Sequence, residues 1–402
     1  MVVALGSVQP VFKPLKTVPD GSEDKPAEGL AIPAIGELTI PSVVLGAATF
    51  SGFYNSEEDY SSAEPVRTVR LALRYGICGF DTSPYYGPSE IVLGNALKAV
   101  ADEFPRESYK IITKCGRYGF NIKEFDYSGP TIRASIERSL ARMHTTYLDA
   151  VYLHDAEFVC EQVGPLEGGN PHEALASQSA EYGLAPGQEG KIWGPGDERI
   201  LEGIAELRKL QEEGKVKAIG ISALPLPVLL RLALLVLHKT GKPLDIMLSY
   251  THVSLQNSLF ATHFAAFKER AKVRQLLTAS PLCMGLLTPR VPTWHPASDA
   301  ARATATEAHA LLTGRGWAGG LPELATGFAF RKGEQLGMPV VIGLSTVAEV
   351  HQCVAAWRRV REAKDTAERD ELEKTVADMF GDMQGYMWQS PEPKALLPLE
   401  TK

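Results

Sequence analysis

The sequence predicts an α/β fold, a (β/α)8 TIM barrel with long loops at its C-terminal face, an N-terminal arm and an extra C-terminal helix. Eight short apolar runs alternate with eight helix-like patterns between residues 43 and 364. The runs are too uniformly apolar for a sheet with one face in water, which indicates parallel strands covered by helices. A chain of 402 residues also has room for such a barrel, typically about 250 residues, together with appendages.

The main rival is a doubly wound open sheet, which usually has about six strands. Such a sheet binds its cofactor at a glycine-rich first turn between strand and helix. The first turn here, LGAATFSGFYNSEED, lacks the required glycine spacing. The barrel is therefore the preferred interpretation.

The expected strands are short runs rich in apolar and β-branched residues. They are 43–48, 77–81, 110–114, 150–154, 216–222, 245–250, 275–280 and 339–343. The expected helices between and after them are 64–75, 90–100, 131–144, 200–213, 227–239, 257–268, 321–336 and 347–364. Gly76, Gly214 and Gly337 each follow the last turn of an expected helix, where a left-handed cap favours glycine.

Three segments follow from this pattern. Residues 1–35 are rich in proline, glycine and charge and predict a flexible N-terminal arm. The barrel is expected over 36–364, and residues 365–402 are expected to form a C-terminal helix, at 366–380, and a proline-rich tail. Two long connections, 155–199 and 281–320, follow the fourth and seventh strands, so both emerge at the C-terminal face, where long loops shape a site.

Composition excludes several classes of partner. The formal net charge is -7, and the chain has no long run of Lys or Arg that would indicate a nucleic-acid surface. The longest apolar stretch, 224–238, is interrupted by prolines and an arginine and is too short to span a bilayer. We therefore expect a small-molecule substrate, no nucleic-acid or membrane partner, and either a monomer or a homodimer.

Cysteine usage and the N-terminal pattern predict a cytoplasmic protein. The five cysteines lie far apart without a C-x-x-C pair, which is typical of reduced thiols rather than of disulfides or a zinc site. The first residues lack the basic start and apolar segment of a signal peptide. No metal site is expected.

Four proton-handling residues stand at the ends of three successive expected strands. Asp81 ends the second strand and Tyr86 lies five residues further on, while Lys114 ends the third strand and His154 the fourth. A parallel barrel gathers the carboxyl ends of its strands at one mouth. We therefore expect Asp81, Tyr86, Lys114 and His154, called the quartet below, to meet there.

The quartet suits reversible proton transfer at a carbonyl or alcohol oxygen. An ammonium ~4 Å from a phenolate stabilises it by ~4 kcal/mol, or about three pKa units. Lys114 is therefore expected to lower the pKa of Tyr86 toward working pH, with Asp81 as the counter-charge of Lys114. His154 would donate a hydrogen bond to the substrate oxygen. Because the quartet holds no nucleophile and no set of metal ligands, a full reaction needs a hydride carrier, and a nicotinamide is the simplest.

At this point the chain resembles the aldo-keto reductases, over residues 38–364. The family pattern D-T-x-x-x-Y-G-x-x-E-x-x-L-G is met from Asp81 to Gly94, and IITKCG, YLHDAE, LQEEGKVKAIGIS, ASPLCMGLLT and VIGLSTVAEVHQCV match as well. The resemblance implies that the quartet is the family's catalytic tetrad, with Tyr86 as acid in reduction and base in oxidation. It also implies a nicotinamide cofactor bound across the barrel mouth without a Rossmann fold.

The resemblance further implies a set of cofactor-binding residues in three groups, near the carboxamide, along the pyrophosphate and at the adenosine half. They are Thr49, Ser222, Ser249, Ser280, Leu282, Gly285, Leu286, Gly343, Ser345 and Glu349. Three positions depart from the usual pattern: Ala223 replaces an asparagine, Ser249 a glutamine, and Ala279 an aromatic that stacks on the nicotinamide.

A fourth departure favours NAD, with NADP still possible. Members that prefer NADP place Lys and Arg where this chain has Leu344 and Val350. Two lost charge-assisted hydrogen bonds would weaken NADP binding by ~3–6 kcal/mol. Glu349 would repel a phosphate, whereas Arg358 or Arg359 could fold back and restore a cation.

The combination of YYGPSE, ASPLCMGLLT and IGLST is most similar to the fungal and plant subgroup that oxidises aldoses such as D-arabinose or L-galactose at C1. The implied reaction is hydride transfer from the anomeric carbon of a cyclic sugar to NAD, giving a lactone. Phe50, Tyr85 and His252 are candidate substrate-wall residues, although Phe50 and Tyr85 suit loop packing equally well.

Two other functions remain open. One is NADPH-dependent reduction of aldehydes such as pyridoxal, which coenzyme preference and reaction direction would distinguish. The other is a cofactor-sensing regulatory subunit with little turnover, which a stable membrane partner would favour. The complete quartet argues against the second.

Overall fold

Eight parallel strands close into a barrel in the computed structural model of this chain, which describes residues 18–388 except 166–167 and 365. The strand order around the barrel is β10-β3-β4-β5-β6-β7-β8-β9. The bounds are β3 (Val43–Gly46), β4 (Gly79–Asp81), β5 (Lys110–Cys115), β6 (Leu148–His154), β7 (Val216–Ser222), β8 (Ile246–Tyr250), β9 (Gln275–Ala279) and β10 (Val340–Gly343). Each lies within or close to an expected run, so the predicted barrel is confirmed.

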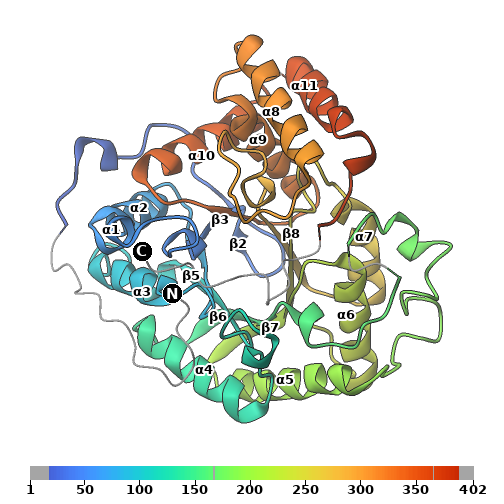
Figure 1. Cartoon of the computed structure of the whole chain (residues 1–402). Coiled ribbons are helices and arrows are strands. Elements are labelled where there is room, and N and C mark those ends of the chain that lie inside the picture. Colours follow the sequence, from blue (N-terminus) through green and yellow to red (C-terminus); the bar gives the residue numbers. More distant parts are fainter. Residues whose placement is uncertain (1–17, 166–167, 365, 389–402) are drawn as a thin grey trace.

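Helices surround the strands, as Figure 1 shows. They are α1 (Glu57–Ser61), α2 (Glu64–Arg74), α3 (Ser89–Ala99), α4 (Gly129–Arg142), α5 (Pro195–Glu212), α6 (Leu226–Thr240), α7 (Phe260–Ala265), α9 (Gly320–Gln335) and α10 (Val347–Arg361). Gly76, Gly214 and Gly337 have φ of 88°, 73° and 63°, the left-handed caps that the sequence predicts. The expected helix at 257–268 differs, because α7 passes into a π-helical turn, Ala266–Arg270.

The apolar alternation of the strands builds two layers of core. Side chains such as Val44, Ile112, Tyr152 and Leu277 fill the barrel interior, and a larger cluster packs between strands and helices. Ile40 of the hairpin β1 (Ala34–Ile35) and β2 (Ile40–Pro41) belongs to the interior cluster. The hairpin directly precedes β3, and Ile40 therefore packs into the N-terminal end of the barrel.

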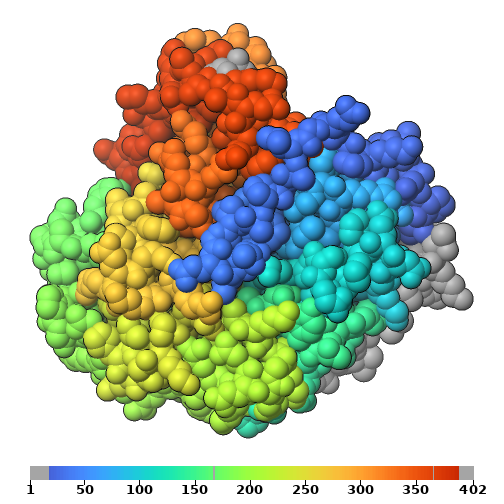
Figure 2. Space-filling model, turned by 180° about the vertical axis from the view of Figure 1, so that it is seen from behind, coloured from blue at the N-terminus to red at the C-terminus, as the bar shows by residue number. Residues whose placement is uncertain are grey.

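The N-terminal segment is packed where the sequence suggested a flexible arm. Asp24 is fully buried, accepts hydrogen bonds from Arg67 and forms an ion pair with Arg70, both on α2. Arg358 of α10 donates to the carbonyl of Leu30. Figure 2 shows this segment in blue, lying across the face opposite to the view of Figure 1. Residues 1–17 of the expected arm lie outside the described residues.

Two helices stand beside the barrel, together with α9, at the top of Figure 1. They are α8 (Asp299–Gly314), inside the long connection after β9, and α11 (Thr366–Met379), the extra C-terminal helix that the sequence predicts. They enclose a separate apolar cluster that includes Leu312, Trp317, Leu324 and Phe380. None of the helices in the described part of the chain has the length and apolar character needed to cross a membrane.

Candidate active site

Three members of the quartet come from neighbouring strands. Asp81 ends β4, Lys114 lies near the end of β5 and His154 ends β6, and these three strands pair in parallel. Lys114 Nζ lies 2.5 Å from Asp81 Oδ1 and donates to the carbonyl of Thr82 at 3.0 Å. The lysine side chain is only 2% exposed, so the ion pair is shielded from water. The barrel thus holds a fixed ion pair, shielded from water, at its mouth.

The loop after β4 brings Tyr86 to this charge. Lys114 Nζ lies 4.8 Å from the centroid of the Tyr86 ring. The Tyr86 and His154 rings meet edge to face, with centroids 5.6 Å apart and planes at 89°. The loop is itself fixed, because Ser89 Oγ donates to the carbonyl of Ala47 at 2.6 Å and Tyr86 N donates to the carbonyl of Ser83. All four residues of the quartet therefore converge.

Burial dominates the protonation of the quartet. It raises the pKa of Tyr86 well above its usual value, and the nearby Asp81 carboxylate raises it further. It lowers the pKa of His154 to about 3, and it raises the pKa of Asp81, although Lys114 opposes that shift. Tyr86 is a neutral phenol and His154 a neutral imidazole near pH 7. The expected lowering of the pKa of Tyr86 by Lys114 is not seen, because desolvation outweighs it.

The two neighbours of His154 determine which ring nitrogen carries its proton. Ser83 Oγ lies 3.0 Å from Nδ1 and already accepts from Tyr85 N at 3.1 Å, so its own hydrogen is available to Nδ1. Asp155 Oδ2 lies 3.5 Å from Nε2. Both contacts favour a proton on Nε2, which we assign from this network. Nε2 is then the nitrogen that can donate to a substrate oxygen.

An aromatic wall and a buried ion pair adjoin the quartet. The Tyr85 ring lies 5.4 Å from Phe53 and 5.7 Å from Phe120, measured between centroids. Arg117 lies 3.7 Å from the centroid of Tyr85, donates to its hydroxyl at 2.9 Å and pairs with Asp155. Sequence reasoning placed Tyr85 but missed the other four residues. Arg117 and Asp155 do carry a signal, because each is charged and lies within two residues of the end of a quartet strand.

The segment after β9, expected to hold the pyrophosphate, has an unusual backbone. Ser280, Cys283, Met284 and Gly285 have φ of 58°, 48°, 53° and 96°. Left-handed conformations in residues other than glycine cost stability and concentrate at ligand sites. The segment lies at the same mouth as the quartet, because β9 is parallel to the other strands of the barrel. The strain marks this loop as a candidate ligand site.

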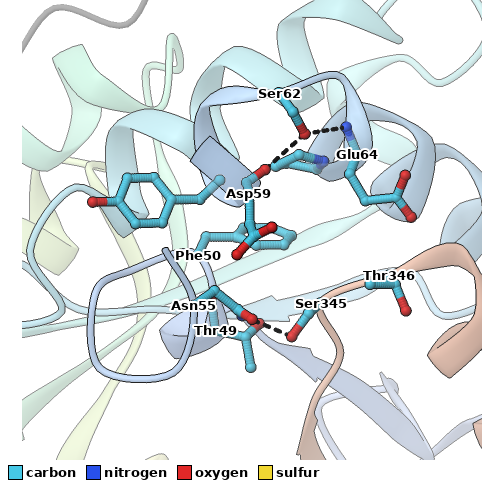
Figure 3. A pocket seen from close by; sticks show the side chains of 10 residues that line it. Thr49, Phe50, Asn55, Asp59, Ser62, Glu64, Ser345 and Thr346 are labelled. Carbon is cyan, nitrogen blue, oxygen red and sulfur yellow. Dashed lines mark hydrogen bonds between the residues drawn. The ribbon is translucent and has the colours of Figure 1, made fainter. Parts of the chain in front are cut away.

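A small polar cavity lies between the end of β10 and the loop before α1, as Figure 3 shows. Its volume is about 140 Å³, and Thr49, Asn55 and Ser345 are among the lining residues. Asn55 Nδ2 donates to Ser345 Oγ at 2.9 Å. Glu349 is turned back onto the start of α10, where its carboxylate accepts from Ser345 N at 2.5 Å. Gly343 is exposed, and a Cβ at this position would lie only 2.8 Å from Thr49 Cγ2. The residue is therefore a glycine whose backbone is open to solvent.

Comparison with known proteins decides the family. The profile of the aldo/keto reductase family matches residues 42–374. The chain is 34% identical over 315 residues to D-arabinose 1-dehydrogenase from Saccharomyces cerevisiae, a match covering 78% of this chain and 81% of the yeast protein.

The chain belongs to the aldo-keto reductase family.

Other similarities agree with this assignment. The identity to L-galactose dehydrogenase from Arabidopsis thaliana is also 34%, over 325 residues that cover 79% of this chain and 85% of the plant protein. The fold is similar to that of an aldo-keto reductase from Bacillus halodurans in its holo form, with a TM-score of 0.56, 19% identity, and coverage of 87% of this chain and 96% of the other. This reductase is therefore an oxidoreductase, with aldose dehydrogenases among its relatives.

Some expected site residues of this aldo-keto reductase lie behind the mouth. Ser249 is fully buried, donates to the carbonyl of Leu224 and lies 2.8 Å from Nδ1 of His252. His252 is fully buried too. Phe50 is 1% exposed and lines the small cavity rather than the quartet. Ser222 does reach the mouth, because it pairs in register with His154.

The positions that would carry NADP-binding cations point inward. Leu344 and Val350 are 2% and 0% exposed and belong to the main apolar core. Arg358 binds carbonyls of the N-terminal segment, and Arg359 lies 4.2 Å from the centroid of Trp317. Neither arginine folds back toward the start of α10. Among residues 18–388, leaving aside the undescribed positions, no group of three or more His, Cys, Asp or Glu is placed to hold a metal ion.

Proposed function

We propose that this aldo-keto reductase oxidises an aldose at C1 to the lactone, with NAD as hydride acceptor and Tyr86 as general base. The observation that carries the proposal is the convergence of the Tyr86 phenol, the buried Lys114–Asp81 pair and a neutral His154 at the barrel mouth. The similarity to two dehydrogenases of sugars supports a sugar as the substrate.

Each member of the quartet has one task in this proposal. His154 Nε2–H donates to the oxygen on the reacting carbon and orients the sugar. The Tyr86 phenolate, which Lys114 stabilises, accepts the hydroxyl proton and becomes the phenol. Asp81 pairs with Lys114 and holds its ammonium in position in a dry site. The nicotinamide, when bound, supplies the hydride-accepting carbon.

The raised pKa of Tyr86 sets a pH dependence for this direction of reaction. Oxidation needs the phenolate, so its rate rises with pH up to the pKa of Tyr86. Reduction needs the phenol, which is the dominant form near pH 7. A single site can therefore run in both directions, with alkaline pH favouring lactone formation.

The coenzyme is proposed to be NAD. The strained segment from Ser280 to Gly285 would hold the pyrophosphate, and the end of β10 with Gly343 and Ser345 would face the adenosine half. Leu344 and Val350 offer no cation to a 2′-phosphate, since both lie in the core. NADP binding should be weaker by ~3–6 kcal/mol than in a protein with both cations.

The substrate side is proposed to be the aromatic wall of Phe53, Tyr85 and Phe120. Flat apolar rings suit the C–H face of a sugar, while the hydroxyls of the sugar need polar partners on the other side. We also propose a cytoplasmic location, because all five cysteines are free thiols. The oligomeric state, monomer or homodimer, can be read from gel filtration.

Initial rates test the proposed function. D-arabinose, L-fucose, L-galactose and D-xylose are each supplied with NAD and with NADP, and reduced nicotinamide is followed by absorbance. We expect NAD-dependent oxidation of at least one sugar, abolished by Tyr86→Phe. Tyr182→Phe is the matched control, because the Tyr182 hydroxyl is buried with no hydrogen-bond partner in the described part of the chain. NADPH-dependent reduction of small aldehydes without sugar oxidation would contradict the proposal.

A further inference from the structure

A carboxylate stands beside the nitrogen that would hold the substrate oxygen. Asp155 follows His154 directly, and its Oδ2 lies 3.5 Å from His154 Nε2. Its side chain is 7% exposed, so it lies in the wall of the site rather than in bulk water. Its backbone is left-handed, with φ 53° and ψ 56°. Aspartate adopts this conformation more readily than most residues, and residues in it are found often at active sites.

Arg117 fixes the position of this carboxylate. The guanidinium, 4% exposed, pairs with Asp155 Oδ2 and donates to the Tyr85 hydroxyl at 2.9 Å. The rings of Tyr85 and Phe125 lie 3.7 Å and 5.1 Å from its central carbon. A buried ion pair of this kind is seldom the most stable way to fill such a space. The pair instead provides a rigid, negatively charged hydrogen-bond acceptor, the Asp155 carboxylate, next to the reacting position.

We propose that Asp155 accepts a hydrogen bond from the hydroxyl on the carbon next to the reacting carbon, and so selects substrates with neighbouring hydroxyls. This inference rests on the proposed function. Asp155 Oδ2 lies 3.5 Å from His154 Nε2, so a hydroxyl on the carbon next to the one whose oxygen binds Nε2 would be within reach of this carboxylate. A carboxylate accepts up to about four hydrogen bonds, of which Arg117 takes only some.

The same geometry rejects simple aldehydes. A substrate without the neighbouring hydroxyl displaces water from the Asp155 carboxylate but provides no hydrogen-bond donor in its place. Sites built to bind a substrate hydroxyl discriminate strongly against analogues that lack it, because a buried polar group is then left unpaired. Asp155 thus distinguishes a sugar dehydrogenase from a reductase of plain carbonyls on the same barrel.

A pair of sugars that differ in one hydroxyl tests this role. 2-Deoxy-D-ribose is D-arabinose without its C2 hydroxyl, and 2-deoxy-L-galactose stands in the same relation to L-galactose. We expect wild-type kcat/KM to favour the parent sugar by about 10- to 100-fold, the range for a hydrogen bond to a charged group. In Asp155→Asn the preference should fall to about threefold or less. The preference is a ratio within one preparation, so the amount of folded enzyme cancels.

Asp197→Asn is the matched control. Asp197 also forms a buried pair with an arginine, Arg231, but makes no contact with the quartet. This variant should keep the wild-type preference even if its stability falls. If Asp155→Asn does not fold, Asp155→Glu displaces the carboxylate by one methylene and should also reduce the preference.

The outcomes separate this inference from the proposed function. No oxidation of any sugar by wild type would remove both. Equal rates with the parent and deoxy sugars in wild type would leave the function intact and overturn the role of Asp155. An unchanged preference in Asp155→Asn, or an equal loss of preference in Asp197→Asn, would overturn it as well.

Discussion

Removing the charge of Lys114 tests how the barrel prepares Tyr86 for catalysis. Burial raises the pKa of Tyr86 well above its usual value. In the proposed mechanism, Lys114 opposes this effect by stabilising the phenolate. Its Nζ lies 4.8 Å from the ring centroid. Lys114→Met keeps most of the side-chain volume and deletes the ammonium.

The size of the effect follows from Coulomb's law for an ammonium near the phenolate. At an effective dielectric of ~20 and a separation of ~5 Å, the attraction between ammonium and phenolate is ~3.3 kcal/mol. That energy corresponds to ~2.4 pKa units, so the pKa of Tyr86 should rise further by about that amount. Below the pKa, each unit lowers the phenolate fraction tenfold, and kcat for oxidation should fall by about 250-fold.

Stability and rate must be separated in this experiment. Lys114→Met leaves Asp81 buried without its partner, which should cost about 3–5 kcal/mol of unfolding free energy. The double variant Lys114→Met/Asp81→Asn should recover much of that loss, because neither partner remains charged. Its kcat should stay low. The assay is the pH profile of kcat for sugar oxidation, with urea unfolding of each variant.

A double variant with near-wild-type kcat and an unshifted pH profile would refute the reasoning. It would mean that Lys114 does not act on the ionisation of Tyr86. A slow double variant whose profile is unshifted would assign Lys114 to positioning instead of electrostatic stabilisation.

Three further predictions concern other ionisable groups. Burial raises the pKa of Asp24, but hydrogen bonds from Arg67 outweigh burial and lower it to about 2. Asp24→Asn should therefore lower the free energy of unfolding by about 1–2 kcal/mol above pH 4, after allowing for solvent screening. That difference should vanish as pH falls through about 2, which acid titration of urea unfolding would show. The pKa of His154 is about 3, so kcat/KM for the sugar should show no ionisation near pH 6.5, and a break there would contradict the buried neutral imidazole. Cys115 and Cys283 are fully buried with raised thiol pKa, so thiol reagents should reach them only after unfolding, as mass spectrometry of labelled peptides can measure.

The barrel and the quartet were accessible from sequence because their signals are local. Apolar runs alternate with helical patterns, and Asp81, Lys114 and His154 stand at run ends, so parallel topology brings them together. The loops could not be treated in this way. His252 looked like a wall residue, but its burial depends on how the loop after β8 folds inward.

The N-terminal segment shows the same limit. Composition indicated a flexible arm, yet Asp24 is buried against two arginines of α2 more than 40 residues away in sequence. Partners at such a separation leave no local pattern. The ion pair of Arg117 with Asp155 likewise could not be recognised as a pair, although each residue lies within two residues of the end of a strand that carries a member of the quartet.

The most direct test of the central claim follows the hydride itself. D-Arabinose carrying deuterium at C1 is incubated with NAD and the enzyme, and both products are examined by mass spectrometry. L-Galactose labelled at C1 is used in parallel. The account predicts deuterium on the reduced nicotinamide, a lactone without it, and no transfer by Tyr86→Phe. Reduced nicotinamide without deuterium, or transfer that persists in Tyr86→Phe, would contradict it.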